Sequence, residues 1–235
     1  MGFGAALSFI IEMFRMLKII SNLLVLSGLL LVYTACANRN SNSASDIPVN
    51  THPQPVYSGK TEKATFALGC FWHSEEMFAE LKGVIDAAPG YAGGNKPNPS
   101  YEDVCTGTTG HAESVDVTFD PTIISYNQLL QVFFAEHDPT TPNYAAPDEG
   151  TQYRSVVFYR NNDQKQQAEK YVQQLTASKK YNNPIITQVV PFTNFYQAED
   201  YHLHYFRKHP NQGYIAGVTR PEIEKFRKDF KDWLK

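Results

Sequence analysis

The sequence has few cysteines, no excess of basic residues and no long uninterrupted apolar run. Its 235 residues include three cysteines, which stand far apart at positions 36, 70 and 105. This spacing excludes a disulfide-stapled scaffold and a cysteine-built zinc site, and we expect no metal site. The 21 basic and 24 acidic residues give a formal charge of -3. The chain therefore has no positive field with which to bind nucleic-acid phosphates, and nucleic acid is not expected as a partner.

The overall composition is that of a globular protein with one or two domains. Hydrophobic residues make up 42% of the chain and charged residues 19%. Fourteen tyrosines and fifteen phenylalanines exceed the needs of a core of this size. We therefore expect some of these rings to line a pocket for an apolar group, while most of them pack in the core.

Residues 1–36 have the layout of a secretory signal peptide. Arg15 and Lys18 precede an apolar run over residues 19–32, and small residues follow it. Polar residues interrupt the run, and it is short for a bilayer core of ~30 Å, which asks for roughly 20 apolar residues. Cleavage is therefore favoured over a permanent membrane span, and the protein is expected to be exported.

The end of this segment resembles the lipobox of bacterial lipoproteins. Cys36 directly follows the small residues, although Tyr33 stands where leucine is usual. We expect Cys36 to be lipidated, and an ordinary signal peptide or anchor remains the alternative. Residues 37–63 are rich in Ser, Asn and Pro and predict a disordered tether. The expected location is the bacterial cell envelope, lipid-anchored and facing the periplasm or the exterior, with no membrane contact other than this anchor.

Residues 64–235 predict a single α/β domain. Apolar alternation indicates strands at 65–68, 84–89, 114–119, 153–159 and 185–191. Helical periodicity indicates helices at 74–81, 125–136 and 163–178, with further helices near 199–208 and 221–234. The resulting β-α-β-β-α-β order predicts a two-layer α+β sandwich with a split β-α-β, ferredoxin-like core. Two long loops, after residue 90 and after residue 137, are expected to carry function.

Cys70 is expected at the turn between the first strand and the first helix of this domain. A helix N-terminus stabilises a thiolate, so we expect a lowered thiol pKa and a nucleophile. A buried, inert cysteine is an equally good interpretation of the position alone. Phe71 and Trp72 place two rings next to the sulfur, which suits an apolar, uncharged substrate group.

Six motifs, taken in order, resemble the A-type peptide methionine sulfoxide reductases. They are Gly-Cys-Phe-Trp at 69–72, Gly-Tyr-Ala-Gly-Gly at 90–94, Asn-Pro-Ser-Tyr-Glu at 98–102, Gly-His-Ala-Glu at 110–113, His-Asp-Pro-Thr at 137–140 and Gln-Tyr-Arg-Ser at 152–155. The resemblance implies an oxidoreductase that reduces methionine S-sulfoxide, free or in proteins, to methionine. Such an enzyme repairs proteins after oxidative stress.

The same resemblance implies two catalytic residues. Cys70 would attack the sulfur of the sulfoxide, release methionine and become a sulfenic acid. The sulfoxide oxygen leaves only if it is protonated, so the site needs a carboxylic acid that stays neutral near pH 7. Glu113 matches the position of the acid in the family.

Five further residues match substrate-binding positions of the family. The hydroxyls of Tyr101 and Tyr153 would bind the sulfoxide oxygen, and Asp148 would join that polar cluster. Phe71 and Trp72 would form the wall of the pocket that accepts the substrate methyl group.

Reduction of the sulfenic acid is where the chain departs from its family. Many members carry a resolving cysteine in a Gly-Tyr-Cys sequence, but this chain has Gly-Tyr-Ile at 213–215. Cys105 is the one remaining internal candidate, and we expect it to be inert. The hypothesis is a one-cysteine enzyme without a bound cofactor that is reduced by an external thiol, namely thioredoxin, glutaredoxin or glutathione, or dithiothreitol in vitro. Its partners would be that thiol reductant and oxidised proteins or peptides bearing methionine S-sulfoxide.

Two other functions are compatible with parts of the sequence. A non-catalytic surface lipoprotein would bind an apolar or oxidised-methionine ligand, and a thiol peroxidase would also use a reactive cysteine. His202, His204 and His209 are expected to lie on the surface rather than to bind a metal.

Overall fold

The computed structural model describes residues 57–235 of the chain. The predicted signal peptide, with Cys36, and the predicted tether as far as residue 56 lie outside the described residues. Within the described part, no helix is long and apolar enough to cross a membrane.

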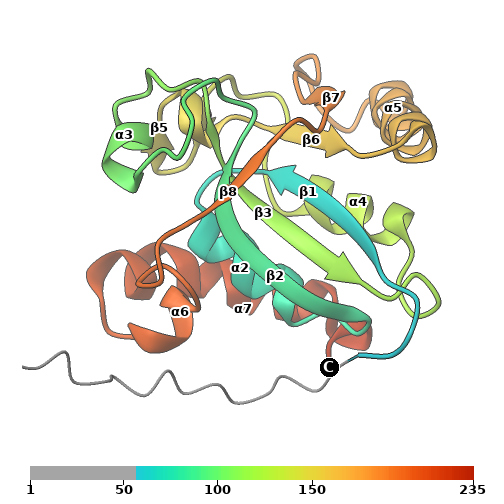
Figure 1. Ribbon diagram of the computed structural model, residues 1–235. Helices are drawn as coiled ribbons and strands as arrows, with labels where there is room; N and C mark the ends of the chain where they lie inside the picture. The colour runs from blue at the N-terminus through green and yellow to red at the C-terminus, as the bar shows by residue number, and fades with distance from the viewer. Residues whose placement is uncertain (1–56) are drawn as a thin grey trace, which may run out of the picture. The chain divides into compact units, whose positions relative to one another are not determined.

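A six-stranded sheet is the frame of this part of the chain (Figure 1). Its strands run in the order β7-β6-β1-β3-β2-β8. Their bounds are β1 Glu62–Ala67, β2 Val84–Ala92, β3 Ala112–Phe119, β6 Val156–Tyr159, β7 Gln188–Pro191 and β8 Phe195–Gln197.

Four of these strands form the predicted ferredoxin-like core. β1 pairs antiparallel with both β3 and β6, and β2 pairs antiparallel with β3. β7 extends the sheet in parallel beside β6, and β8 adds an antiparallel strand beside β2. The β-α-β-β-α-β order and the two-layer α/β class predicted from the sequence are therefore confirmed.

Helices complete the fold. Their bounds are α2 Phe71–Ala79, α3 Tyr101–Cys105, α4 Tyr126–Ala135, α5 Asn162–Ser178, α6 Tyr205–Lys208 and α7 Arg220–Asp229, with a π-helical turn at Ile215–Thr219 and 3-10 turns at Thr151–Tyr153 and Lys231–Trp233. Helix α4 begins where the sequence predicts, because Ser125 and Gln128 form a reciprocal capping box.

The main core lies between the sheet and helices α2 and α4. Phe66 of β1 is fully buried, and its ring centroid lies 5.3 Å from those of both Phe78 of α2 and Phe133 of α4. Burial of each such side chain contributes about 1.5–3 kcal/mol to folding. This packing fixes the end of β1 against the start of α2, which is where Cys70 lies.

The structure differs from the sequence-based expectation in its loops and near the C-terminus. The loop after residue 90 contains α3, and the loop after residue 137 contains a small hairpin of β4 (Tyr144–Ala145) and β5 (Asp148–Glu149). The helix expected at 199–208 is formed only at its end. The Glu199 carboxylate instead accepts hydrogen bonds from the Tyr91 hydroxyl and the Tyr101 backbone N–H. These bonds hold the start of residues 199–208 against the sheet, and the chain forms turns there instead of a helix.

Candidate active site

Cys70 occupies the turn between β1 and α2. It caps the N-terminus of α2, and its side chain is half-buried. Gly69 has a φ of 104°, and a Cβ atom there would lie 2.6 Å from the Cβ of Ala145. Glycine is therefore required before the cysteine, and the turn places the thiol at the helix terminus as the sequence predicts.

The pKa of the Cys70 thiol is raised, so the expectation of a lowered pKa is wrong. Burial is the largest cause, and the negative charges of Glu113 and Asp148 add to it. Hydrogen bonds from the backbone N–H of Trp72 and from the Tyr214 hydroxyl lower the pKa, but they do not compensate for the burial and the two charges. Desolvation outweighs the helix terminus, because the charged form loses more solvation than the terminal N–H groups return. The resting site therefore holds a thiol at neutral pH.

Glu113 lies on β3 next to this turn and is 2% exposed. The backbone N–H of Phe71 donates a 3.0 Å hydrogen bond to its Oε2. Burial raises the pKa of Glu113 to about 8, the Phe71 N–H opposes this, and the charge of Asp148 adds to it. The carboxyl group is therefore mostly protonated at pH 7, as the sequence-based argument expects. Its role as the acid stays a prediction.

The two rings that follow the thiol belong to an aromatic cluster. Phe71 is 1% exposed, and its ring centroid lies 6.2 Å from that of Tyr101 and 4.9 Å from that of His202. Trp72 stacks on Tyr205 at 4.0 Å, and its Nε1–H donates to Nδ1 of His202. His202 is therefore buried inside the cluster, which corrects the surface position expected for it.

Tyr101 and Tyr153 approach Glu113 from two different segments. Tyr101 is the first residue of α3, and Tyr153 ends a 3-10 turn. Burial raises the pKa of both phenols, and the charge of Glu113 raises it further. Both hydroxyls therefore stay protonated and can donate hydrogen bonds. We call Phe71, Trp72, Tyr101, Glu113 and Tyr153 the aromatic site.

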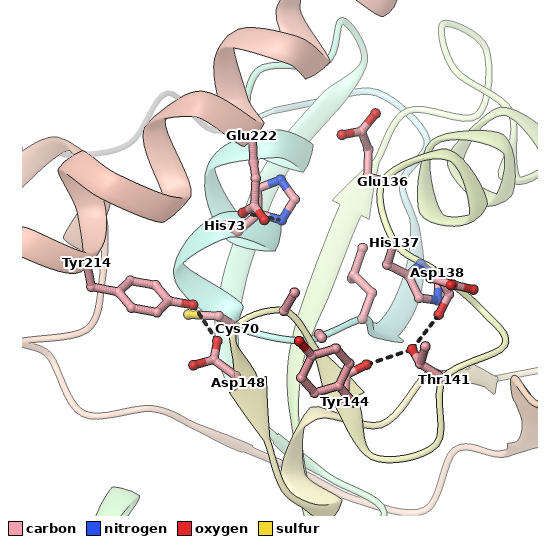
Figure 2. Close-up of a pocket in the computed structure, with 13 residues that line it drawn as sticks. Cys70, His73, Glu136, His137, Asp138, Thr141, Tyr144, Asp148, Tyr214 and Glu222 are labelled. Atoms are coloured by element: carbon pink, nitrogen blue, oxygen red, sulfur yellow. Dashed lines mark hydrogen bonds and ion pairs between the residues drawn. The ribbon is translucent and has the colours of Figure 1, made fainter.

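Sequence reasoning missed one residue of the site, Tyr214. Its hydroxyl donates a hydrogen bond to Oδ2 of Asp148, and both side chains lie beside Cys70 (Figure 2). Burial raises the pKa of Asp148, and the bond from Tyr214 lowers it. The only sequence signal for Tyr214 is the Gly-Tyr-Ile sequence at 213–215, which matches the Gly-Tyr-Cys sequence of the family except for its cysteine.

A cavity of about 300 Å³ also opens on Cys70. Of the seven site residues expected in this domain, only Cys70 and Asp148 line it. Its other lining residues are Leu68, His73, Glu136, His137, Asp138, Thr141, Tyr144, Ala145, Ala146, Tyr214 and Glu222. Because four of the lining residues are Asp or Glu, we call it the acidic cavity. The sulfur therefore borders two different environments, the aromatic site and the acidic cavity.

Neither of the two described cysteines is in a disulfide. Cys105 is exposed at the end of α3. Burial of its sulfur raises the pKa of the thiol, and a hydrogen bond with Tyr101 lowers it. Among residues 57–235, no group of three or more His, Cys, Asp or Glu side chains is arranged to hold a metal ion.

Comparison with known proteins agrees with the motifs. The profile of the family "Peptide methionine sulfoxide reductase" matches residues 62–234. A peptide methionine sulfoxide reductase MsrA of Polynucleobacter asymbioticus is 51% identical over 173 residues, covering 74% of this chain and 91% of that protein. An MsrA of Thermus thermophilus is 49% identical over 174 residues, covering 74% of this chain and 98% of that protein.

Two solved structures share the fold. The reduced form of Mxr1 from Saccharomyces cerevisiae is 39% identical with a TM-score of 0.61, covering 66% of this chain and 88% of that one. The methionine sulfoxide reductase A of Corynebacterium diphtheriae is 35% identical with a TM-score of 0.58, covering 66% and 77%. The sequence, the family profile and the fold thus agree, and the chain belongs to the A-type peptide methionine sulfoxide reductases, an enzyme family that reduces methionine sulfoxide.

Proposed function

We propose that Cys70 and Glu113 carry out the reduction of methionine S-sulfoxide to methionine. The observation that carries this assignment is the buried Glu113 carboxyl, which is neutral at pH 7 and is bonded to the N–H of the residue after Cys70. A neutral carboxylic acid beside a sulfur nucleophile is the pair that the reaction requires, because the sulfoxide oxygen must be protonated as the S–O bond breaks.

The reaction leaves methionine as product and a sulfenic acid on the enzyme. The sulfur of Cys70 attacks the sulfur of the sulfoxide to form an S–S bond, and the proton of Glu113 and the thiol proton go to the sulfoxide oxygen, so the S–O bond breaks and the oxygen leaves as water. A water molecule then attacks the Cys70 sulfur, the S–S bond breaks, methionine leaves, Cys70 becomes a sulfenic acid, and one proton returns to Glu113. Methionine sulfur is reduced by two electrons, and the cysteine sulfur is oxidised by two.

The remaining residues of the aromatic site would bind the substrate. Tyr101 and Tyr153 keep their phenolic protons and lie in the field of Glu113, so they are suited to donate to the sulfoxide oxygen. Phe71 and Trp72 are packed in one aromatic cluster beside Glu113, and we assign them to the substrate methyl group. Asp148 is bound by Tyr214, and we assign it to orienting the polar cluster.

Epimer selectivity tests this function. The full chain is incubated with dithiothreitol and a peptide that contains either the S or the R epimer of methionine sulfoxide, and methionine is quantified. We expect reduction of the S epimer alone, and no reduction by Cys70→Ser. Binding of the sulfoxide peptide without reduction would instead support a non-catalytic binder, and faster turnover with hydrogen peroxide would support a thiol peroxidase.

We also propose that an external thiol completes the cycle. The chain has no cysteine after Cys105, and Cys105 is a free, exposed thiol. Thioredoxin and glutaredoxin with glutathione are the candidate donors, and dithiothreitol serves in vitro. Recovery of a Cys70–Cys105 disulfide after one equivalent of sulfoxide, by peptide mass mapping, would contradict a one-cysteine cycle.

The location of the enzyme is a separate proposal. We propose that residues 1–36 direct export to the bacterial cell envelope and that Cys36 carries the lipid. The support is the basic, apolar and small-residue order of that segment. Radiolabelled palmitate should enter the wild-type chain in cells and not Cys36→Ser. Equal labelling of the two would contradict lipidation at this residue.

A further inference from the structure

The acidic cavity lies against the reactive sulfur but is not explained by the sulfoxide. Glu113, Tyr101 and Tyr153 do not line it, so the groups suited to a sulfoxide lie outside this cavity. Its volume of about 300 Å³ lies at the small end of the range for small-molecule sites, ~300–1,000 Å³. The cavity therefore fits a compact ligand that must reach the sulfur.

The charge of the cavity restricts that ligand. The lining contains the carboxyl groups of Glu136, Asp138, Asp148 and Glu222, and neither Lys nor Arg (Figure 2). One cation approaches from outside the lining, since Nζ of Lys225 lies 3.6 Å from Oε1 of Glu136. Burial raises the pKa of Glu136 and Asp148, and it raises that of Glu222 to about 7. The cavity therefore becomes more negative as pH rises through about 7, where it attracts a cation and repels an anion.

One buried polar atom in the lining, Nε2 of His73, has no hydrogen-bond or ion-pair partner within residues 57–235, and His73 is 6% exposed. Oε2 of Glu222 lies 3.9 Å from the other ring nitrogen, Nδ1, beyond hydrogen-bond distance. By contrast, His137 is satisfied, because its ring nitrogens contact the Phe133 carbonyl and the Ser155 hydroxyl. The cavity thus offers the unpartnered Nε2 of His73 to a ligand that carries polar hydrogens.

We propose that the acidic cavity admits small thiol reductants in the second half-reaction, and that among them it favours thiols bearing a positively charged amine over anionic thiols such as glutathione. This inference rests on the proposed function, because it requires the sulfenic acid on Cys70. The ammonium group would lie among the carboxylates near Glu222, and the thiol sulfur would face Cys70.

The chemistry balances with two equivalents of thiol. The first thiol sulfur attacks the sulfur of the Cys70 sulfenic acid, an S–S bond forms, and the hydroxyl leaves as water with the thiol proton. A second thiol attacks the sulfur of the bound aminothiol, which releases Cys70 as a thiol and the two reductants as a disulfide. The enzyme sulfur gains two electrons, and two thiols lose one each.

The test follows the sulfenic acid in a single turnover. The full chain is oxidised with one equivalent of S-sulfoxide peptide and mixed with cysteamine, 2-mercaptoethanol or 3-mercaptopropionate at equal thiolate concentration and low salt. We expect cysteamine to react at least about tenfold faster than 3-mercaptopropionate, with 2-mercaptoethanol between them. Glu222→Gln should bring the three rates closer together, whereas Glu224→Gln, which changes an exposed carboxylate on the same helix, should not.

A second measurement avoids both the sulfoxide and the Glu222 variant. Reduced Cys70 in the full chain with Cys36→Ser and Cys105→Ser is modified by cationic 2-aminoethyl or anionic 2-sulfonatoethyl methanethiosulfonate, and the loss of free thiol is timed. The cationic reagent should react faster, and added salt should reduce the difference. Equal rates for the two reagents, or a cysteamine preference that Glu222→Gln leaves unchanged, would overturn the proposal. Failure to form methionine in the first turnover would instead overturn the proposed function.

Discussion

The aromatic site and the acidic cavity share Cys70, and burial raises the pKa of a carboxyl group in both, but they hold different numbers of carboxyl groups. The aromatic site holds one, Glu113, whose pKa rises to about 8. Glu113 therefore keeps the proton that the departing sulfoxide oxygen needs. The acidic cavity holds four, and the charges of Asp148 and Glu136 help to raise the pKa of Glu222 to about 7. The cavity therefore becomes more negative as pH rises through about 7.

The difference also explains why the thiol pKa is not lowered. Cys70 is half-buried between these two environments, and both contain carboxyl groups that disfavour a thiolate. The backbone N–H of Trp72 and the hydroxyl of Tyr214 are the groups that favour the thiolate. The site therefore rests with protons on both Cys70 and Glu113, and the substrate meets an acid that is already protonated.

The largest expected effect is the loss of the nucleophile that both environments share. Cys70→Ser should lower methionine formation at least about 10³-fold, because a serine hydroxyl is a far weaker nucleophile in this site. Methionine formation from a sulfoxide peptide with dithiothreitol is the measurement, and Cys105→Ser is the matched control. Loss of activity in the control as well would place the chemistry on both thiols.

Removing the acid affects the aromatic site alone. Glu113→Gln keeps the shape but cannot donate a proton, so methionine formation should fall about 10²-fold or more. The protonated carboxyl dominates below its pKa, so the wild-type rate should fall as pH rises through about 8. A single-turnover pH profile should show this fall in the wild type and lack it in the variant. Glu149→Gln, an exposed carboxylate on β5, should retain the wild-type profile.

The buried carboxyl group of Glu113 also predicts that the free energy of unfolding depends on pH. The pKa of Glu113 is about 8 in the folded chain and 4.5 without the fold, so its favourable contribution is fully present below 4.5 and is lost progressively as pH rises from there through 8. Glu113→Gln should therefore gain stability relative to the wild type between pH 5 and pH 8. Urea unfolding at both pH values measures this, and a constant difference would contradict a buried neutral acid.

A smaller effect is expected at the border between the two environments. Tyr214→Phe removes a hydroxyl that bonds to Asp148 and lowers the pKa of Cys70, so that pKa should rise further. The rate should fall by about tenfold, the value of one hydrogen bond of ~1 kcal/mol or slightly more. Iodoacetamide alkylation against pH measures the thiol pKa directly. An unchanged alkylation profile, with Tyr159→Phe as the control, would exclude this role.

The smallest effect tests whether one thiol suffices. Cys105→Ser should change the first turnover and the steady-state rate with dithiothreitol by less than about twofold, because Cys105 is exposed and free. A normal first turnover followed by a large loss of steady-state rate would identify Cys105 as the resolving thiol.

Local patterns predicted most of the fold. Helix α4 has both an apolar stripe and a capping box at Ser125, so sequence and structure agree at its start. The strands of the core alternate or form apolar runs, and their order sets the topology. β8 spans only Phe195–Gln197 and exists through its pairing with β2, which no local pattern encodes.

The sequence predicts the raised pKa of Glu113 but not the pKa of the Cys70 thiol. The motifs place Cys70 and Glu113, but desolvation depends on side chains brought together from distant segments, which reverses the effect of the helix terminus. Tyr214 reaches Asp148 across 66 positions of the chain. The burial of His202 was missed for the same reason, because it depends on contacts with Phe71 and Trp72, which are distant in the sequence.

The sulfur of Cys70 lies between the aromatic site and the acidic cavity, and it becomes a sulfenic acid in the aromatic site before any reductant acts. The most direct test mixes the reduced full chain with excess S-sulfoxide peptide and no thiol, then quantifies methionine and traps the sulfenic acid with dimedone for mass spectrometry. We predict one methionine per chain and one dimedone adduct, located on Cys70. No methionine, or an adduct on another residue, would contradict the account.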